Sequence, residues 1–333
     1  MKMGYRKKSM LAGYAFAAPG MIFAVLYMGY PLLRSFYLSF TNYNFAFDSQ
    51  PALCGLENYI NMFKDSYFLD SFRNTAVFTL AFFPSLMILS LIIALLLDKG
   101  VKGSGIYRTC IFMSMVVPLS LTGIIFQWIF NNQYGLLNSV LTQIFGLKSW
   151  THNWLGEGKW AMFSIIVVSL WKNMGMLVIF FMAGLANIPD DIIEAAKIDG
   201  SNSIQTTFRI ILPNLKESYI VCGVWAIIQS VKVFEQPFVM TNGGPGTSTL
   251  VLYQYTWQNA FKYYEMGYAS AIGYFMGIII LILSAINMFA NRDKNVDEVK
   301  SKRKRKGVCR YSNSIIRYYC RGLSFINGSP WNV

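Results

Sequence analysis

The sequence is short of charged residues, and above all of acidic ones. Only 14% of the 333 residues are charged, and 16 Asp and Glu stand against 29 Lys and Arg. An average soluble domain has about 25% charged residues. Because 54% of the residues are hydrophobic and 16% are aromatic, the composition excludes both an ordinary soluble domain and a disordered chain. It predicts a membrane protein, in which the position of the +13 net charge must be explained.

Residues that bind metals or carry out catalysis are also scarce. The single histidine, His152, excludes a multi-histidine metal centre. No phosphate-binding loop motif occurs, and Lys102-Gly103-Ser104-Gly105 resembles one only superficially. No intramembrane carboxylate pair or Ser/His pair suggests an enzyme. We therefore expect no catalytic residue, no metal and no cofactor in this chain. The five cysteines show neither zinc-site nor disulfide-framework spacing: Cys54, Cys110, Cys222, Cys309 and Cys320.

Long apolar segments are the main positive feature. A helix needs about 20 mostly apolar residues to cross a bilayer, and six segments qualify, so we predict an all-α integral membrane protein with about six transmembrane helices. The first is interrupted by Pro19-Gly20 and has a signal peptide as its alternative. Its only A-x-A match leaves about five apolar residues upstream, fewer than a signal peptide needs, so we retain it as a span. The six segments are approximately 11–30, 74–97, 107–130, 160–183, 219–239 and 267–290.

The basic residues predict the orientation. Placing both termini in the cytoplasm puts most Lys and Arg on the cytoplasmic side, as the positive-inside rule requires. Residues 1–10 then form a cytoplasmic basic N-terminus, 11–292 the membrane domain and 293–333 a cytoplasmic basic tail. The run 300–306 is the one feature like a nucleic-acid-binding segment, but basic residues beside a membrane commonly meet anionic lipid. We therefore expect no nucleic-acid partner.

One loop, residues 187–217, is patterned rather than simply polar. Pro189, Asp190 and Asp191 favour a helix start and Gly200 its end. We predict a second short helix with Ser201 or Ser203 as its cap and Pro213 as its end. Both helices are too short and polar to span, and they lack the basic bias of lipid-lying helices. A docking surface for a partner protein fits better, with a buttress inside this protein itself as the other alternative. The apolar side of the first helix comprises Ile192, Ile193, Ala196 and Ile198.

These residues carry a family resemblance. Glu194-Ala195-Ala196-x-x-Asp199-Gly200, continued by Phe208, Ile210 and Leu212-Pro213, resembles the EAA loop of ABC-importer permeases. Thr241-Asn242-Gly243-Gly244-Pro245 with Ser248-Thr249 is similar to the sugar-importer branch, of the maltose-importer F-subunit and lactose or glycerol-phosphate permease type. Pro19-Gly20, Tyr30-Pro31 and Ser39-Phe40-Thr41 match the same branch. The resemblance covers residues 10–292, and the tail departs from it.

The resemblance implies a type I ABC-importer permease in a bacterial cytoplasmic membrane. Such a permease pairs with a second, homologous permease and with two ATPase subunits, which bind the ATP and Mg. An extracytoplasmic binding protein delivers the sugar, and we expect it to meet the outer loops 41–73 and 133–159. The EAA helices transmit closure of the ATPases to the membrane helices. By this resemblance the coupling residues are Glu194, Ala195, Ala196, Asp199 and Gly200.

Polar residues within spans predict the substrate path, because they are costly in a membrane unless they face a cavity or a partner. Lys172 has two alternatives to substrate contact, which are pairing with Glu235 or snorkelling. The substrate is an oligosaccharide or related sugar, with glycerol phosphate, a polyol or an acidic sugar as alternatives. A secondary transporter is less favoured, since it usually needs carboxylates deep in the spans. Partly from polarity and partly from the maltose-type resemblance, the path comprises Ser169, Trp171, Asn173, Met176, Gln229, Ser230 and Lys232.

Glycines in the last span predict close helix packing. Gly273 and Gly277 have the small-xxx-small spacing, and Gly267 precedes them on the same segment.

Overall fold

The computed structural model describes residues 5–98 and 103–291. The described residues are helical, apart from turns and two isolated β-bridges, so the all-α prediction is confirmed. The chain divides into a unit of residues 1–288 and a second of 289–333, of which only 289–291 are described. The predicted basic tail 293–333 and the first four residues lie outside the described residues.

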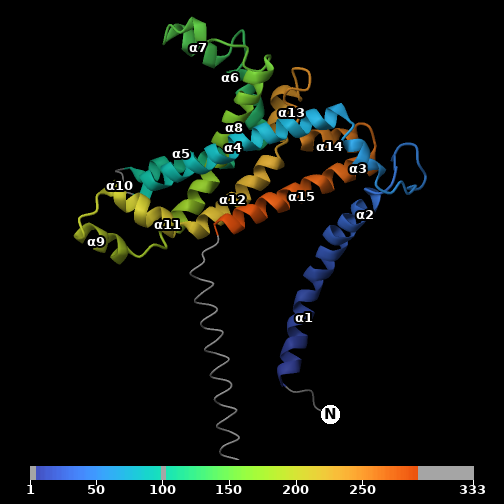
Figure 1. The fold of residues 1–333 in the computed structure, drawn as a ribbon, viewed down its shortest axis with the longest axis horizontal. Helices are drawn as coiled ribbons and strands as arrows, with labels where there is room; N and C mark the ends of the chain where they lie inside the picture. The colour runs from blue at the N-terminus through green and yellow to red at the C-terminus, as the bar shows by residue number, and fades with distance from the viewer. Residues whose placement is uncertain (1–4, 99–102, 292–333) are drawn as a thin grey trace, which may run out of the picture. The chain divides into compact units, whose positions relative to one another are not determined.

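Figure 1 shows the order of the helices along the chain. Outside the first span and the 187–217 loop, their bounds are α3 (Glu57–Met62), α4 (Ser66–Asp98), α5 (Ser104–Val116), α6 (Leu119–Ile129), α7 (Leu136–Gln143), the 3₁₀ turn η2 (Lys148–Trp150), α8 (Gly158–Leu185), α12 (Lys216–Val231), α13 (Glu235–Thr241), α14 (Leu252–Phe261) and α15 (Met266–Ala290).

The first span is an unbroken helical run. It consists of α1 (Tyr5–Ala24), the π-helical turn η1 (Val25–Gly29) and α2 (Tyr30–Leu38). The predicted interruption at Pro19-Gly20 is wrong, because the helix continues through Pro19. None of the apolar window within 13–38 is buried in this chain. Lipid or another protein must therefore surround this helix.

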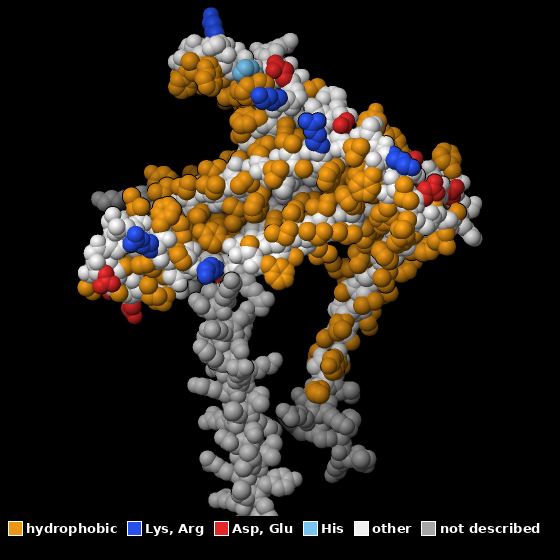
Figure 2. Space-filling model, viewed as in Figure 1, with side chains coloured by type: hydrophobic (Ala, Val, Ile, Leu, Met, Phe, Trp, Pro, Cys, Tyr) orange, Lys and Arg blue, Asp and Glu red, His pale blue; other side chains and the backbone are white. Residues whose placement is uncertain are grey.

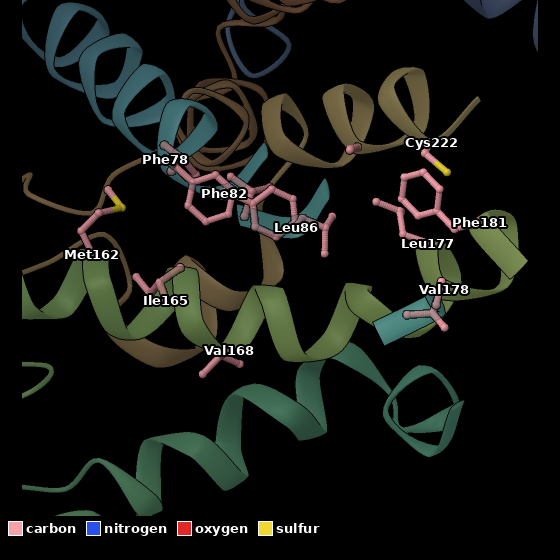
Figure 3. Close-up of a cluster of buried hydrophobic side chains, with 14 of the residues drawn as sticks. Phe78, Phe82, Leu86, Met162, Ile165, Val168, Leu177, Val178, Phe181 and Cys222 are labelled. Carbon is pink, nitrogen blue, oxygen red and sulfur yellow. The ribbon is translucent and has the colours of Figure 1, made fainter. Parts of the chain in front are cut away.

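Helices α4, α8 and α12 enclose the main core. Figure 3 shows Phe78, Phe82 and Leu86 of α4 lying between α8 and α12, and all three side chains are at most 1% exposed. Phe181 of α8 and Cys222 of α12 are fully buried in the same cluster. Each such aromatic or leucine side chain contributes about 1.5–3 kcal/mol when it is removed from water, less where lipid is the alternative. The packing of these three helices forms the main hydrophobic core, to which the loops are attached.

The predicted third span is a bent pair of helices. Helices α5 and α6 are bent by 102° where they meet at Val117 and Pro118. The prediction of one continuous helix is therefore wrong in detail. Proline has no N–H and clashes with the preceding turn, so it ends or kinks a helix. Among the described residues, five other apolar helical stretches each meet the length and hydropathy of a span on their own, including the α12–α13 stretch with its short interruption.

The connections show that the bent pair crosses the membrane. Near the start of α4, the Asn74 amide donates to the carbonyl oxygen of Thr247 at 2.6 Å, and a Cβ on Gly158, which begins α8, would lie 2.8 Å from the Cβ of Ser248. Helices α4 and α8 therefore begin on the same side of the membrane. The chain leaves α4 on the opposite side and must return before α8 begins. Helices α5 and α6 make that return, which gives six crossings among the described residues.

The surface agrees with a membrane environment. On the face shown in Figure 2, orange hydrophobic side chains cover most of the long helices, and the few charged side chains lie mostly on loops and helix ends. Exposed Leu80, Leu281 and Phe289 are examples, at 71–76% of their full exposure. Contiguous exposed apolar surface on this scale marks contact with lipid or with other proteins.

Candidate substrate pocket and coupling loop

A pocket lies where two spans are interrupted. Met115 and Leu119 border the bend between α5 and α6, and Lys232, Val233 and Glu235 lie at the interruption between α12 and α13. Helix α8 supplies one wall. The remaining lining residues are Phe78, Phe82, Ser169, Lys172, Asn173, Met176, Trp225, Gln229 and Gln236.

Five of the seven predicted path residues line this pocket. Helical spacing explains why, because residues three, four and seven apart share one helix face. Residues 169, 172, 173 and 176 of α8 have this spacing. The pocket brings together Ser169, Asn173, Met176, Gln229 and Lys232.

Two predicted path residues lie elsewhere. Trp171 is 39% exposed, and its ring packs edge-on against Phe126 of α6 with centroids 5.4 Å apart. Ser230 is fully buried and its hydroxyl donates to the Ile227 carbonyl oxygen at 2.9 Å. Neither side chain lines the pocket, although both are adjacent in sequence to residues that do.

The pocket offers unused hydrogen-bonding groups beside aromatic rings. The Ser169 hydroxyl oxygen is buried and has no partner among the described residues. The Asn173 side-chain amide donates to the Ser169 carbonyl at 2.8 Å, which leaves its own oxygen available. Trp225 and Phe82 supply apolar walls. A few polar groups set in an apolar, aromatic surface are typical of small-molecule sites.

Lys172 is the buried cation of the pocket, at 9% exposure. Its ammonium group donates to the carbonyl oxygens of Ser114 at 2.7 Å and Met115 at 3.0 Å, and also to that of Val117. Neither pairing with Glu235 nor snorkelling describes this side chain. Lys232, in contrast, is exposed at the end of α12.

Sequence reasoning did not find Trp225, Phe78 or Gln236 as pocket residues. The aromatic ones gave no signal, because apolar side chains in a span are ordinary. Gln236 is polar and only 3% exposed, and its place beside Glu235 in a predicted span was a signal of the same kind as Gln229.

The 187–217 loop forms two helical segments, as predicted. Helix α9 (Asp190–Ile198) ends before Gly200, whose φ of +80° favours glycine. Asn202 caps the second segment, with its side-chain oxygen accepting from the Gln205 N–H at 2.8 Å. The prediction of Ser201 or Ser203 as the cap is therefore wrong. Pro213 also does not end the segment, because Asn214 is still helical. The second segment comprises α10 (Ser203–Thr206), the π turn η3 (Thr207–Ile211) and α11 (Leu212–Asn214).

The loop presents a mixed charged and apolar surface. Of the predicted coupling residues, Ala196 alone is buried, at 6% exposure, and it anchors α9. Glu194, Ala195, Asp199 and Gly200 are exposed. Large apolar side chains beside them are left uncovered, and such a patch marks an interaction surface: Ile192, Ile198, Ile204 and Phe208 are 42–86% exposed.

The loop is joined tightly to the membrane core. Leu215, at its end, is 1% exposed and belongs to the main cluster. A Cβ on Gly184, near the end of α8, would lie 1.9 Å from the Ser218 hydroxyl oxygen. The two spans that flank the loop therefore meet at its base, so a force on the loop reaches α8 and α12 directly.

The Asn-Gly-Gly-Pro segment forms a tight turn after α13. Asn242 and Gly243 have φ values of 51° and 87°, a left-handed conformation that Gly and Asn tolerate best. The Thr249 hydroxyl donates to the Gly244 carbonyl oxygen at 2.7 Å. The turn thus explains why Asn and Gly stand at these positions. The loop that follows the turn also accepts a hydrogen bond from the Asn74 amide of α4, at the Thr247 carbonyl oxygen.

The chain matches a family model described as "Binding-protein-dependent transport system inner membrane component" over residues 68–292. The chain belongs to this family. The resemblance to permeases of such importers is therefore confirmed, and the protein is a multi-pass membrane permease. The match begins after α3 and includes the bent pair, the pocket helices and the 187–217 loop.

Two relatives and one solved structure extend the comparison. The sulfoquinovosyl glycerol transport system permease protein of Agrobacterium fabrum is 33% identical, covering 84% of this chain and 89% of its own. The multiple sugar-binding transport system permease protein of Streptococcus mutans serotype c is 34% identical, with coverages of 83% and 93%. A bacterial alginate ABC transporter chain, solved with an alginate pentasaccharide-bound periplasmic protein, aligns with TM-score 0.73 at 19% identity, covering 86% of this chain and 95% of its own. That last likeness supports the type I importer fold.

Proposed function

We propose that this permease forms, with a second homologous permease, the membrane path of an ABC importer for an oligosaccharide or related sugar. The observation that carries the proposal is the pocket that lies where two spans are interrupted. The exposed apolar and acidic side chains of the 187–217 loop support it, because they offer a surface for a partner. Two relatives are named for sugar transport. The chain itself is a non-catalytic subunit, and the ATP and Mg belong to partner ATPase subunits.

The 187–217 loop, which we call the coupling loop, is the proposed ATPase-docking surface. Helix α9 exposes the carboxylates of Glu194 and Asp199 beside Ile198. A partner cleft that combines a cation with an apolar floor would complement them. Ala195 is small and exposed, so a partner can approach closely, and Gly200 makes the sharp reversal. Because the loop base is packed against α8 and α12, movement of the ATPases would reach the pocket walls.

The other partners are inferred from the remaining uncovered surfaces. The first span has no buried residue in its apolar window, which favours a second permease beside it. An extracytoplasmic binding protein would meet the loops between 41 and 73 and between 133 and 159, on the side opposite the coupling loop. The predominance of Lys and Arg on the coupling-loop side favours cytoplasmic termini.

The pocket chemistry favours a hydroxylated ring. Ser169 and Asn173 offer hydrogen bonds, and Trp225 offers a face for stacking. An acidic sugar remains the alternative, and the exposed ammonium of Lys232 is the group that would receive its charge. One relative is named for the transport of sulfoquinovosyl glycerol, and this name supports the acidic-sugar alternative. Glycerol phosphate and polyols are the other alternative substrates, and an importer of the same architecture would carry them.

The test is ATP-dependent uptake by the complete importer in proteoliposomes. Labelled neutral oligosaccharides, an acidic oligosaccharide and glycerol phosphate are offered separately with the cognate binding protein outside and ATP inside. We expect uptake of a sugar that stops when vanadate is added or when the ATPase subunits are left out. Uptake that survives both treatments would overturn the ABC proposal and favour a secondary transporter.

A further inference from the structure

The bend between α5 and α6 leaves carbonyl groups without their usual partners. In a continuous helix the Ser114 carbonyl accepts from the N–H of residue 118, but residue 118 is proline and has none. The 102° bend removes the later partners as well. Backbone groups left unpaired within a membrane cost several kcal/mol each. The bend therefore requires a donor from elsewhere in the protein.

Lys172 supplies these donors from the neighbouring helix α8. An ammonium group has three hydrogens, and Lys172 uses them on the carbonyls of Ser114, Met115 and Val117. A helix C-terminus also carries partial negative charge, which a cation stabilises. With its three donors engaged, this ammonium is not available to a substrate unless the end of α5 is released.

A second contact fixes the same end of α5. One turn further along α8, a Cβ on Gly175 would lie 2.9 Å from the carbonyl oxygen of Ile111. The two helices thus touch backbone to backbone at Gly175 and are joined by hydrogen bonds at Lys172. Because these points are three residues apart on one face, α5 cannot turn or slide on α8 without breaking one of them.

The fixed bend is also a wall of the pocket. Met115 and Leu119, on either side of the bend, line the same pocket as Ser169 and Asn173. After the bend, α6 packs on α13, and a Cβ on Gly123 would lie 2.8 Å from a Val239 methyl carbon. The direction of α6 therefore also determines where α13 places Glu235.

We propose that Lys172 is a positioning residue, which holds the bend between α5 and α6 in the shape that forms the pocket wall, and that it does not bind the substrate. The proposal deepens the proposed function, on which its meaning for transport rests. It also assigns any recognition of an acidic sugar to Lys232, because that ammonium is the exposed one at the pocket.

The bend is measured by the separation of two spin labels in the full chain in lipid nanodiscs, with its cysteines replaced by alanine. Labels at Tyr107 and Trp128 are suitable, because these side chains are 54% and 68% exposed. Two arms of about 15 Å, bent by 102°, give a backbone separation of about 19 Å. A straight helix gives about 32 Å. This measurement needs neither a substrate nor a partner.

We expect Lys172→Met to broaden the distribution at least twofold, and Lys172→Arg to restore a narrow one. Lys172→Met combined with Pro118→Ala restores the N–H for Ser114, so it should give a folded chain with a straightened span and the longer separation. Lys232→Met, the matched control, should leave the distribution unchanged. A wild-type distribution in Lys172→Met overturns the proposal. So does a double variant that fails to fold, because satisfying the carbonyl would then not replace the lysine.

The uptake assay separates this proposal from the proposed function. If Lys172 positions the wall, Lys172→Met lowers the maximal uptake rate of every accepted substrate at least tenfold, whereas Lys172→Arg keeps most of it. A selective loss of acidic substrates in Lys172→Met, with a normal bend, overturns the positioning role and leaves the importer assignment intact. Absence of ATP-dependent uptake in the wild type overturns the importer assignment, while the spin-label result still decides the role of Lys172.

Discussion

The Tyr255 hydroxyl donates a 2.5 Å hydrogen bond to the carboxylate of Asp65, which precedes it by 190 residues. The same carboxylate oxygen accepts from Tyr268 at 2.8 Å, and its other oxygen accepts from the Tyr67 N–H at 3.0 Å. Asp65 therefore joins the first turns of α4, α14 and α15. One carboxylate thus holds three helices together, and we call this group the Asp65 cluster.

Tyr255→Phe should destabilise the Asp65 cluster. It removes one hydrogen bond to a charged group from a side chain that is 8% exposed, a loss of about 1.5–3 kcal/mol. The measurement is thermal unfolding of the purified permease in detergent. Tyr253→Phe is the matched control, because it lies on the same helix and is 39% exposed. Equal melting temperatures for the two variants would contradict the role of Asp65.

The same pair should be insensitive to pH until strongly alkaline conditions. Burial raises the pKa of the Tyr255 hydroxyl above its ordinary 10.0, and the hydrogen bond to Asp65 raises this pKa further. A raised folded-state pKa means that the stabilisation is complete below the ordinary value and is lost as pH rises through the higher one. The difference in unfolding temperature between wild type and Tyr255→Phe should stay constant from pH 7 to 9 and shrink as the pH rises above 10. A difference that shrinks between pH 7 and 9 would show that the hydroxyl ionises there.

Gly267→Ala should disrupt the contact between α15 and the segment that follows α2. A Cβ at Gly267 would lie 2.0 Å from the Thr41 carbonyl oxygen, whereas a Cβ at Gly273 on the same helix meets nothing within 4 Å. We expect Gly267→Ala to lower the unfolding temperature by several degrees and Gly273→Ala to leave it unchanged or raise it slightly. Thermal unfolding of the two variants side by side provides the check. A stable Gly267→Ala would show that the loop moves away at little cost.

This pair also shows what sequence reasoning could predict. The small-xxx-small spacing pointed to Gly273 and Gly277, but neither approaches another part of the described chain, so within this chain that prediction is wrong. Gly267 is the one of the three with a backbone against it. Spacing marks which residues share a helix face, but it does not tell which neighbour that face meets.

The site was predicted to a similar degree. The positions of the spans followed from apolar length, and the coupling loop from its start and end residues. Within α8 and α12 the predicted pocket residues followed from polarity and from the maltose-type resemblance. Two of them are directed elsewhere, because Trp171 packs on α6 and the Ser230 hydroxyl bonds a carbonyl of its own helix. The role of Lys172 depends on Pro118, 54 positions away, and no pattern local to either residue reveals that pairing. Contacts between spans are set by packing, which a single sequence does not encode in its periodicity.

Glu194→Lys should uncouple transport from ATP hydrolysis without unfolding the permease. Glu194 is exposed on α9, so reversing its charge costs little stability and acts on the partner instead. We expect substrate-stimulated ATPase activity of the assembled importer to fall at least tenfold. Glu217→Lys is the control, because Glu217 is also exposed, close to the loop but in the first turn of α12. Normal stimulated activity in an assembled Glu194→Lys importer would remove Glu194 from the coupling surface.

Ser169→Ala should weaken substrate binding while leaving the fold intact. The Ser169 hydroxyl oxygen lines the pocket, is buried and has no partner among the described residues. Removing a buried hydroxyl that lacks a partner relieves its desolvation cost, so stability should hold or rise by up to about 1 kcal/mol. If the substrate supplies the missing partner, the KM for uptake should rise about five- to tenfold, as expected for one lost hydrogen bond of about 1–1.4 kcal/mol. Ser90→Ala makes the same change at a buried, unpartnered hydroxyl on α4 that does not line the pocket. Like Ser169→Ala, the Ser90→Ala variant should be at least as stable as the wild type, but its KM for uptake should equal that of the wild type. Equal KM values for the two variants would mean that the hydroxyl of Ser169 makes no contact with the substrate, and that recognition on α8 rests on Asn173.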